Sequence, residues 1–355
     1  MVPPAIAINP QMEANHTIRR ATIRDVARLA GVSHQTVSRV INDHRAVAEP
    51  TREKVEEAIR LLGYVPSSMA RGLASNRTHT IGLVSTDISD YFFAQAAGGA
   101  EVEARRHGYY LLIASVEEHA EPDERAYMRL MLERRVEGLI IARPKLPISP
   151  DRLRPRNAPR VPLLAIGAGP TLGLTVVDVD NRRGGLEATS LLIDLGHRSI
   201  ATICGPSVWP SAHARLEGYR HALADGGVPY EERLVESAPG WGLASGQKAA
   251  ARLLTRGVRF TAIFAQSDLL AIGAIKELRA HGIGVPEEVS VVGYDDIPVA
   301  SFVDPPLTTV HQPMTEVGKR AVSLVLHAVG KDEAEPTVDL LPVRLVIRDS
   351  AVPPP

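Results

Sequence analysis

The sequence contains a single cysteine, Cys204, and has no long apolar run. One cysteine excludes an intramolecular disulfide and is typical of a protein from a reducing cytoplasm. No apolar stretch approaches the length of a membrane helix, and residues 1–16 lack the apolar core and basic flank of a signal peptide. We therefore expect a cytoplasmic protein in which residues 1–20 form a disordered extension, with Met1 and Met12 as alternative start residues.

Common enzyme signatures are also missing. There is no GxxxxGKS or GxxxxGKT phosphate loop, no GxGxxG after an expected strand, no GxSxG elbow and no HExxH motif. The 12 histidines are scattered without the spacing of metal ligands. We expect no enzymatic activity, no bound metal and no cofactor.

Charge is balanced over the 355 residues, with 40 basic against 41 acidic side chains, but it is unevenly distributed. Residues 17–77 carry eleven Lys and Arg against six Asp and Glu, and the net negative charge falls on residues 78–355. This asymmetry is typical of a small domain that faces DNA, joined to a larger, mildly acidic domain.

The stretch TIRDVARLAGVSHQTVSRVI, residues 22–41, predicts two short helices around a tight turn. Thr22 and Asp25 have the spacing of a capping box, Gly31 can end the first helix and Ser33 can cap the second. The expected inner face of the first helix is Val26, Leu29 and Ala30.

The second helix of this stretch divides into an apolar and a polar face. Its inner stripe is Val37, Val40 and Ile41, and its outer face carries His34, Gln35, Ser38 and Arg39. Glutamine can pair with adenine, and arginine with guanine or phosphate, when such a helix enters the major groove. An ordinary helical hairpin with a solvated face is the alternative for the motif taken alone.

A third helix is expected from about Pro50, placed at its first position, to Gly63, with an inner stripe of Val55, Ala58, Ile59 and Leu62. Together, SHQTVSRVIN, the segment TREKVEEAIRLLGYVP and the following YVPSSMARGLA resemble the headpiece and hinge of the LacI/GalR family of bacterial repressors. The resemblance extends to about Asp349. It implies that a leucine at position 73 enters the minor groove, and that the DNA-binding set is Thr22, Ser33, His34, Gln35, Thr36, Ser38, Arg39, Asn42, Ser67, Ala70 and Leu73.

From His79 onward, short apolar strands alternate with segments of helical length. This pattern predicts two parallel sheets with helices on both faces, hence two lobes. Small ligands in such folds bind beyond the carboxyl ends of the strands. The expected fold is an all-α helix-turn-helix headpiece followed by a two-lobed α/β sensor that, by resemblance, is similar to periplasmic binding proteins.

Polar and aromatic side chains follow the expected strands. Indole and phenyl faces cover the C–H side of a sugar ring, and carboxylates and guanidinium groups hold its hydroxyls. The predicted effector set is Thr86, Asp87, Tyr91, Phe92, Arg143, Arg183, Arg215, Trp241, Ser267, Asp268 and Asp295. Purely structural interpretations stay open for Trp241 as lobe packing, for Asp268 as a helix cap and for Arg183 as part of a solvated helix face.

The resemblance implies that Arg215, Trp241 and Asp295 match positions that contact sugars in carbohydrate-responsive members. Arg183 departs from the lactose-responsive pattern, where a carboxylate would stand, and Ala142 and Ser267 replace asparagines. A galactoside held in that manner is therefore not expected. Arg182 and Arg183 suggest the hypothesis of an acidic or phosphorylated sugar.

The expected domains are residues 21–65 for DNA binding, 66–78 as hinge helix and linker, 79–349 for effector binding and dimerisation, and 350–355 as a tail. The predicted function is a nucleoid-associated bacterial repressor of carbohydrate-utilisation genes, controlled by a sugar-like effector. A palindromic operator requires a homodimer. A sugar-binding transport protein with the same sensor fold is the alternative function.

Overall fold

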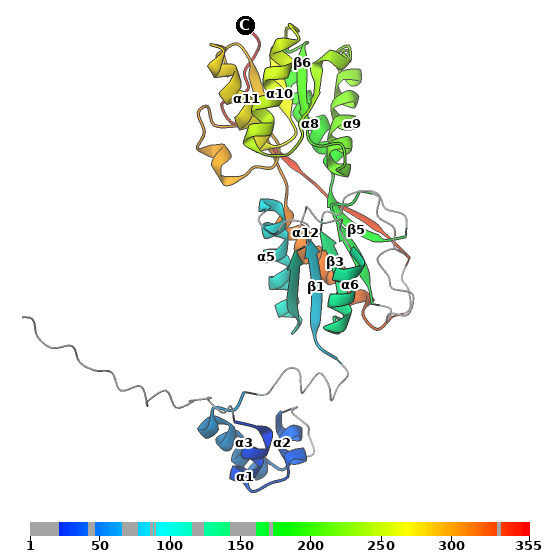
Figure 1. Cartoon of the computed structure of the whole chain (residues 1–355), viewed down its shortest axis with the longest axis vertical. Helices are drawn as coiled ribbons and strands as arrows, with labels where there is room; N and C mark the ends of the chain where they lie inside the picture. The colour runs from blue at the N-terminus through cyan, green and yellow to red at the C-terminus, as the bar shows by residue number, and fades with distance from the viewer. Residues whose placement is uncertain are drawn as a thin grey trace, which may run out of the picture. The chain divides into compact units, whose positions relative to one another are not determined.

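The computed structural model describes residues 21–41, 47–65, 77–85, 88, 90–115, 124–142, 161–169, 173–331 and 335–355. The chain divides into two compact units, Met1–Thr78 and His79–Pro355 (Figure 1). The predicted extension, residues 1–20, and the predicted hinge helix, residues 66–74, lie outside the described residues.

Three helices close a small core in the first unit. They are α1 (Ile23–Ala30), α2 (His34–Ile41) and α3 (Glu49–Leu62). The capping box is present, because the Thr22 hydroxyl accepts from the Asp25 amide while the Asp25 carboxylate accepts from the Thr22 amide at 3.0 Å. Gly31 ends α1 at φ +67°, a backbone conformation that favours glycine. The buried core consists of Val26, Ala27, Val37, Val40, Val55 and Ala58.

The expected inner faces need correction at two leucines. Leu29 is 52% exposed and Leu62 is 37% exposed, and Ala27 takes the buried position beside Val26 on α1. On α1, of eight residues, the buried side chains are those of Val26 and Ala27. The third helix begins at Glu49, one residue before the expected start at Pro50.

The first lobe of the second unit is built on a six-stranded parallel sheet in the order β11-β5-β4-β3-β1-β2. The strands are β1 (Thr80–Ser85), β2 (Tyr110–Ser115), β3 (Gly138–Ala142), β4 (Leu163–Ile166), β5 (Thr175–Val179) and β11 (Val338–Leu341). Helices α5 (Tyr91–Arg106) and α12 (Met314–Ala328) contribute to the core on one face. Helix α6 (Glu124–Glu133) contributes to the core on the other.

The second lobe contains a four-stranded parallel sheet in the order β7-β6-β8-β9. Its strands are β6 (Ile200–Cys204), β7 (Val235–Ser237), β8 (Ala262–Ala265) and β9 (Ser290–Val292). Two pairs of helices cover its faces: α8 (Asn181–Asp194) with α9 (Pro210–Asp225), and α10 (Leu243–Thr255) with α11 (Asp268–Ala280). Two short 3-10 helices complete the lobe, η1 (Glu232–Leu234) and η2 (Pro298–Ser301).

The chain passes between the lobes several times. It leaves the first lobe after β5, returns to it through β10 (Thr309–His311) into α12 and β11, and leaves again through β12 (Arg344–Val346), which pairs antiparallel with β10. The orange and red segments in Figure 1 show this return. The sequence patterns had indicated the two sheets but not that the C-terminal α12 and β11 complete the first lobe.

Residues 350–355 lie against the second lobe. Ser350 is fully buried, accepts from the Thr308 amide at 2.8 Å and donates to the Val291 carbonyl at 2.6 Å. The Val352 carbonyl is 2.9 Å from the imidazole Nε2 of His197. These contacts join the end of the chain to β9 and to the turn before β6.

Candidate functional site

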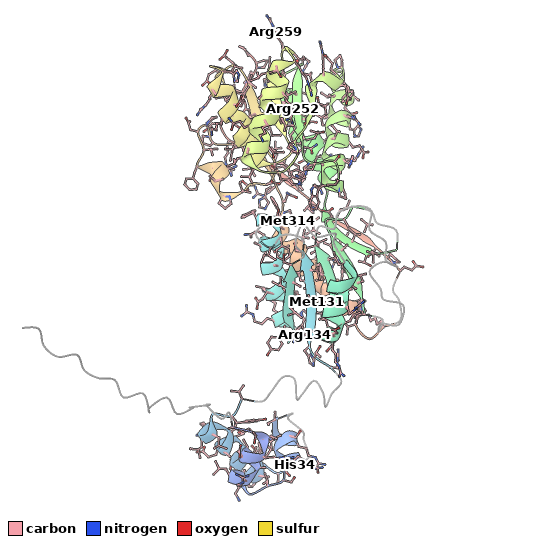
Figure 2. All side chains as sticks on the ribbon, in the orientation of Figure 1. His34, Met131, Arg134, Arg252, Arg259 and Met314 are labelled. Atoms are coloured by element: carbon pink, nitrogen blue, oxygen red, sulfur yellow. The ribbon has the colours of Figure 1, made fainter. Side chains whose placement is uncertain are left out.

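The outer face of α2 carries exposed polar side chains in the described part of the first unit. Ser33 caps the helix, because its hydroxyl accepts from the Thr36 amide at 3.1 Å. Val37 and Val40 are buried, whereas His34, Gln35 and Arg39 are exposed and Thr36 and Ser38 partly buried. Figure 2 shows His34 at the surface of this unit. Three side chains that can meet base edges or phosphates therefore share the start and the outer side of one helix.

Other residues of the predicted DNA-binding set have different places. The exposed Thr22 begins α1, and its hydroxyl lies 2.7 Å from a carboxylate oxygen of Asp25, so it contributes to the cap. Four members lie outside the described residues: Asn42, Ser67, Ala70 and Leu73.

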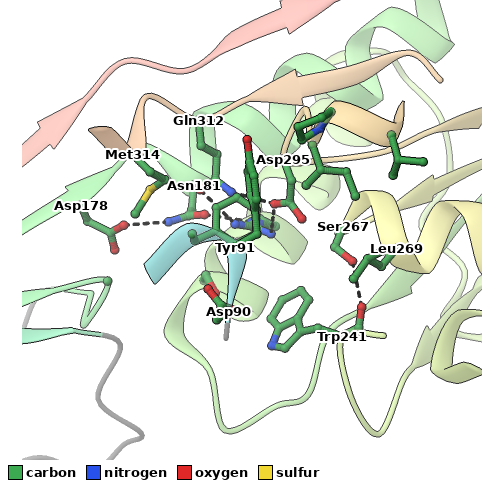
Figure 3. Close-up of a pocket in the computed structure, with 17 residues that line it drawn as sticks. Asp90, Tyr91, Asp178, Asn181, Trp241, Ser267, Leu269, Asp295, Gln312 and Met314 are labelled. Carbon is green, nitrogen blue, oxygen red and sulfur yellow. Dashed lines mark hydrogen bonds and ion pairs between the residues drawn. The ribbon is translucent and has the colours of Figure 1, made fainter. Parts of the chain in front are cut away.

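A cavity of about 600 Å³ lies between the two lobes of the second unit (Figure 3). Six residues of the predicted effector set line it, namely Tyr91, Phe92, Arg215, Trp241, Ser267 and Asp295. Its other lining residues are Asp90, Gly167, Asp178, Asn181, Ser211, Leu269, Ile297, Pro298, Val299, Gln312 and Met314. The walls thus combine aromatic faces with a concentrated group of polar side chains. The predicted residues Thr86, Asp87 and Arg143 lie outside the described residues.

Arg215, on α9 and 5% exposed, is the centre of the polar wall. Its Nε donates to the Asn181 side-chain oxygen at 2.9 Å, Nη1 to the Gln266 carbonyl at 2.5 Å and Nη2 to the Gln312 side-chain oxygen at 3.3 Å. Nη1 also lies 3.7 Å from Asp295 Oδ1, which accepts from Gln312 Nε2 at 2.7 Å. A buried guanidinium paired in this way is both charge-compensated and rigid.

Two aromatic rings flank the same guanidinium. The Arg215 Cζ atom is 3.7 Å from the ring centroid of Tyr294 and 5.5 Å from that of Trp241. Tyr294 is fully buried, and burial raises the pKa of its hydroxyl, so the ring remains neutral. Cation–π contacts on both rings add to the orientation of Arg215.

Backbone strain accompanies the acidic residue of this wall. Asp295 has φ 123° and Asp296 has φ 57°, backbone conformations that residues other than glycine rarely adopt. Asp296 is held by Arg348 at 2.6 Å and His311 at 3.0 Å, which fixes the loop. Strained residues that the surroundings fix firmly cluster at binding sites.

Two residues of the predicted effector set lie outside the cavity. The side chain of Arg183 lies on the outer side of α8, where its Nε donates to Glu187, one turn further along the same helix, at 2.7 Å. Asp268 is fully buried at the start of α11, accepts from the Ile297 amide at 2.9 Å and from the Thr309 hydroxyl, and burial raises its pKa to about 7. The structure thus places Arg183 at the surface of its helix, and it places Asp268 in a contact that joins α11 to the following loop and to β10.

Several residues that line the cavity were not in the effector set predicted from the sequence. Asp178 lies inside the apolar strand β5. Because a buried carboxylate is unfavourable without a specific role or partner, its place in this strand could have marked it as a candidate site residue. Gln312 and Met314 follow β10, whose three residues are too few for a periodic pattern. Ser267 was found, and it caps α11 through a 3.1 Å bond from the Leu270 amide while lining the cavity.

Within the described ranges, no helix has the length and apolar character needed to cross a lipid bilayer. The same ranges contain no group of three or more His, Cys, Asp or Glu side chains arranged to hold a metal ion.

Comparisons with known proteins agree with this fold. The family model described as bacterial regulatory proteins, lacI family, matches residues 22–67, and that of the periplasmic binding protein-like domain matches residues 172–351. The HTH-type transcriptional repressor CytR of Escherichia coli is 34% identical over 339 residues, which are 96% of this chain and 98% of CytR. The chain belongs to the LacI family of bacterial regulatory proteins.

Solved structures of LacI-family proteins have the same architecture. The Lac repressor dimer bound to operator and the anti-inducer ONPF is similar with a TM-score of 0.84 and 30% identity, over 94% of this chain and all of that one. The transcriptional regulator CelR in its cellobiose complex has a TM-score of 0.70 and 35% identity, over 93% of this chain and all of that one. The predicted fold, and the prediction of a DNA-binding transcriptional regulator, are confirmed.

Proposed function

We propose that this LacI-family protein is a cytoplasmic homodimer that represses carbohydrate-utilisation genes at a palindromic operator, and that a sugar or sugar derivative bound between its lobes controls operator binding. The observation that carries the proposal is the presence, in one chain, of an exposed base-reading helix and a polar, aromatic-walled cavity. A transport protein would need the cavity and have no use for the helix. No catalytic role is proposed.

On the DNA side, α2 supplies the specific contacts. Gln35 and Arg39 can read purines in the major groove, and His34 at the helix start can reach a base or a phosphate. One such helix reads only a few base pairs, so two copies on a symmetric operator are required for a specific site.

On the ligand side, the relative CelR has been solved with cellobiose, which makes carbohydrate the first class to test. The cavity here offers the indole of Trp241 as a face for the C–H side of a sugar ring and the wall around Arg215 and Asp295 for hydroxyls. Its volume of about 600 Å³ is within the range typical of small-ligand sites.

The polar side chains around Arg215 can link ligand binding to DNA binding, because they lie where the chain passes between the lobes. Asn181 follows β5 and Gln312 follows β10, two of the places where the chain passes between lobes, and Arg215 bonds both. A ligand that touches this wall can favour one lobe arrangement only if it binds the two arrangements with different affinity. The same change then alters operator binding at the headpiece, as induction or as corepression.

The test is a selection of genomic DNA fragments by the purified full-length protein, followed by titration of the selected operator with candidate sugars. A palindromic site whose affinity changes at least tenfold with one sugar is expected. Absence of any sequence preference at low ionic strength would remove the regulator function, whereas a preference that no sugar alters would remove only the carbohydrate effector.

A further inference from the structure

Gln266 is a fully buried residue that directly follows β8 and is not itself among the residues that line the cavity. Its side-chain oxygen accepts from the Gly205 amide at 3.0 Å, and its side-chain nitrogen donates to the Ala212 carbonyl at 3.1 Å. Its backbone carbonyl accepts from Arg215 Nη1 at 2.5 Å. Buried polar groups need such partners, so Gln266 satisfies groups from two other segments of the second lobe.

Two of these bonds hold the same helix. Ala212 and Arg215 are three residues apart on α9, so the groups that Gln266 contacts lie about one turn apart. The Gln266 side chain holds the first position and its backbone carbonyl holds the second. Two contacts one turn apart fix both the position and the rotation of the start of α9. The Arg215 guanidinium therefore extends into the cavity from a fixed base.

The third bond fixes the backbone beneath Trp241. Gly205 directly follows β6, and a Cβ atom on it would lie 2.1 Å from Cη2 of the Trp241 ring. The indole thus lies directly against the Gly205 backbone, whose amide Gln266 holds. The neighbouring Ser267 hydroxyl donates to the Trp241 carbonyl at 3.3 Å (Figure 3). The end of β8 consequently determines where this ring stands.

We propose that Gln266 is a positioning residue that sets the affinity of the cavity for its effector, because it fixes Arg215 and Trp241 relative to each other. The inference rests on the proposed function, since it concerns the ligand of the same cavity. An apolar side chain of similar length would fill the space of Gln266. It would leave the buried Gly205 amide and Ala212 carbonyl without this partner.

The variant Gln266→Met tests the first part of the proposal, because methionine has nearly the same length and no amide. Full-length protein with Trp209→Phe serves as the parent, so that Trp241 is the one remaining of two tryptophans. We expect Gln266→Met to raise the acrylamide quenching constant of Trp241 fluorescence at least twofold, because the ring loses its fixed support. Lower stability alone does not change this constant at a temperature where the variant is folded.

Calorimetric titration of the same proteins with cellobiose and with ribose measures the affinity of the cavity. For a sugar that the parent binds, we expect at least tenfold weaker binding by Gln266→Met, because the start of α9 no longer holds Arg215 in place. Gln266→Asn keeps the amide and shortens its reach by one methylene. It should change the quenching constant in the same direction and bind the sugar at least threefold more weakly, and it replaces the methionine variant if that variant does not fold.

Gln247→Met is the matched control. Gln247 lies on α10 of the same lobe, donates to Glu277 at 2.8 Å and does not line the cavity. The substitution removes the same kind of side chain and one of its hydrogen bonds. The quenching constant and the sugar affinity of the control should both stay within twofold of the parent.

Each outcome separates this inference from the proposed function. Sugar affinity within twofold of the parent, or an unchanged quenching constant, in a folded Gln266 variant overturns the inference and leaves the proposed function standing. Equal changes in Gln247→Met also overturn it, because they would show a general loosening of the second lobe. If neither sugar binds the parent while the quenching constant rises as expected, the fixing of Trp241 by Gln266 is supported and the carbohydrate effector is not.

Discussion

Arg215 on α9 and Asn181 at the start of α8 are joined by a 2.9 Å hydrogen bond from the guanidinium Nε to the amide oxygen. The bond is possible because α8 and α9 pack closely: a Cβ atom on Gly185 would lie 2.3 Å from the Arg215 carbonyl oxygen. Since Asn181 follows the strand by which the chain leaves the first lobe, this bond links the cavity wall to an interlobe connection.

The first prediction concerns Arg215→Ala. We expect loss of the effector response with operator binding retained, and destabilisation of about 3–5 kcal/mol, because the buried ion pair with Asp295 is broken and the hydrogen bonds of the guanidinium are lost. Operator titrations with and without sugar, below the midpoint of thermal unfolding, measure the response. Arg183→Ala, which removes an arginine outside the cavity, is the control and should respond as the wild type does. Loss of operator binding in both variants would contradict the separation of the two sites.

The second prediction concerns Gln35→Ala. Removing one bidentate base contact should lower discrimination between operator and random DNA by about 1–3 kcal/mol, with ligand affinity unchanged. Competition titrations at two salt concentrations separate this from a phosphate contact, because the salt dependence should stay the same. An equal loss of affinity for both DNAs would assign Gln35 to the backbone instead.

The third prediction compares adjacent glycines of α5. A Cβ atom on Gly99 would lie 2.0 Å from the Thr315 carbonyl oxygen of α12, whereas one on Gly98 would have no neighbour within 4 Å. Gly98→Ala should therefore raise the free energy of unfolding by about 0.5–1 kcal/mol through helix propensity. Gly99→Ala should lower it by several times that amount, because the two helices must separate. Urea unfolding of both variants gives the comparison, and equal stability would mean that the helices do not approach this closely.

Much of the architecture could be predicted because its signals are local. The cap and glycine of α1, the apolar stripe of α2 and the apolar strands are each written within a few neighbouring residues. The contribution of α12 and β11 to the first lobe is not local, since it depends on the pairing of β11 with β5, more than 150 residues earlier in the chain.

At the cavity too, local sequence signals do not show which single residues the fold brings together. Arg183 and Arg215 both follow strands that end near the cavity, so the sequence pattern predicts the same role for both. Only the fold separates them: Arg215 turns inward between Tyr294 and Trp241, and Arg183 pairs with Glu187 on the surface of its own helix. Met314 and Gln312 were missed because a short strand brings them in from the C-terminal part of the chain.

The last prediction follows from Asp268. Burial raises the pKa of this carboxyl to about 7 from an ordinary value of 3.8. Between those pH values the folded protein keeps a proton that the unfolded chain has released. The free energy of unfolding should therefore fall as pH rises through this window, by at most about 1.4 kcal/mol per pH unit from this group.

Asp268→Asn resembles the protonated acid, because its oxygen can accept from the Ile297 amide and its amide can donate to Thr309. The variant should consequently gain stability relative to wild type from pH 5 to pH 8, as measured by urea unfolding. Asp304→Asn, whose side chain is 90% exposed in an ion pair with Arg279, should follow the wild-type pH dependence. A stability difference between Asp268→Asn and wild type that is equal at pH 5 and pH 8 would show that Asp268 is ionised throughout. The link from α11 to β10 would then be an ionic hydrogen bond over the whole range, because Thr309 would donate to a carboxylate at every pH tested.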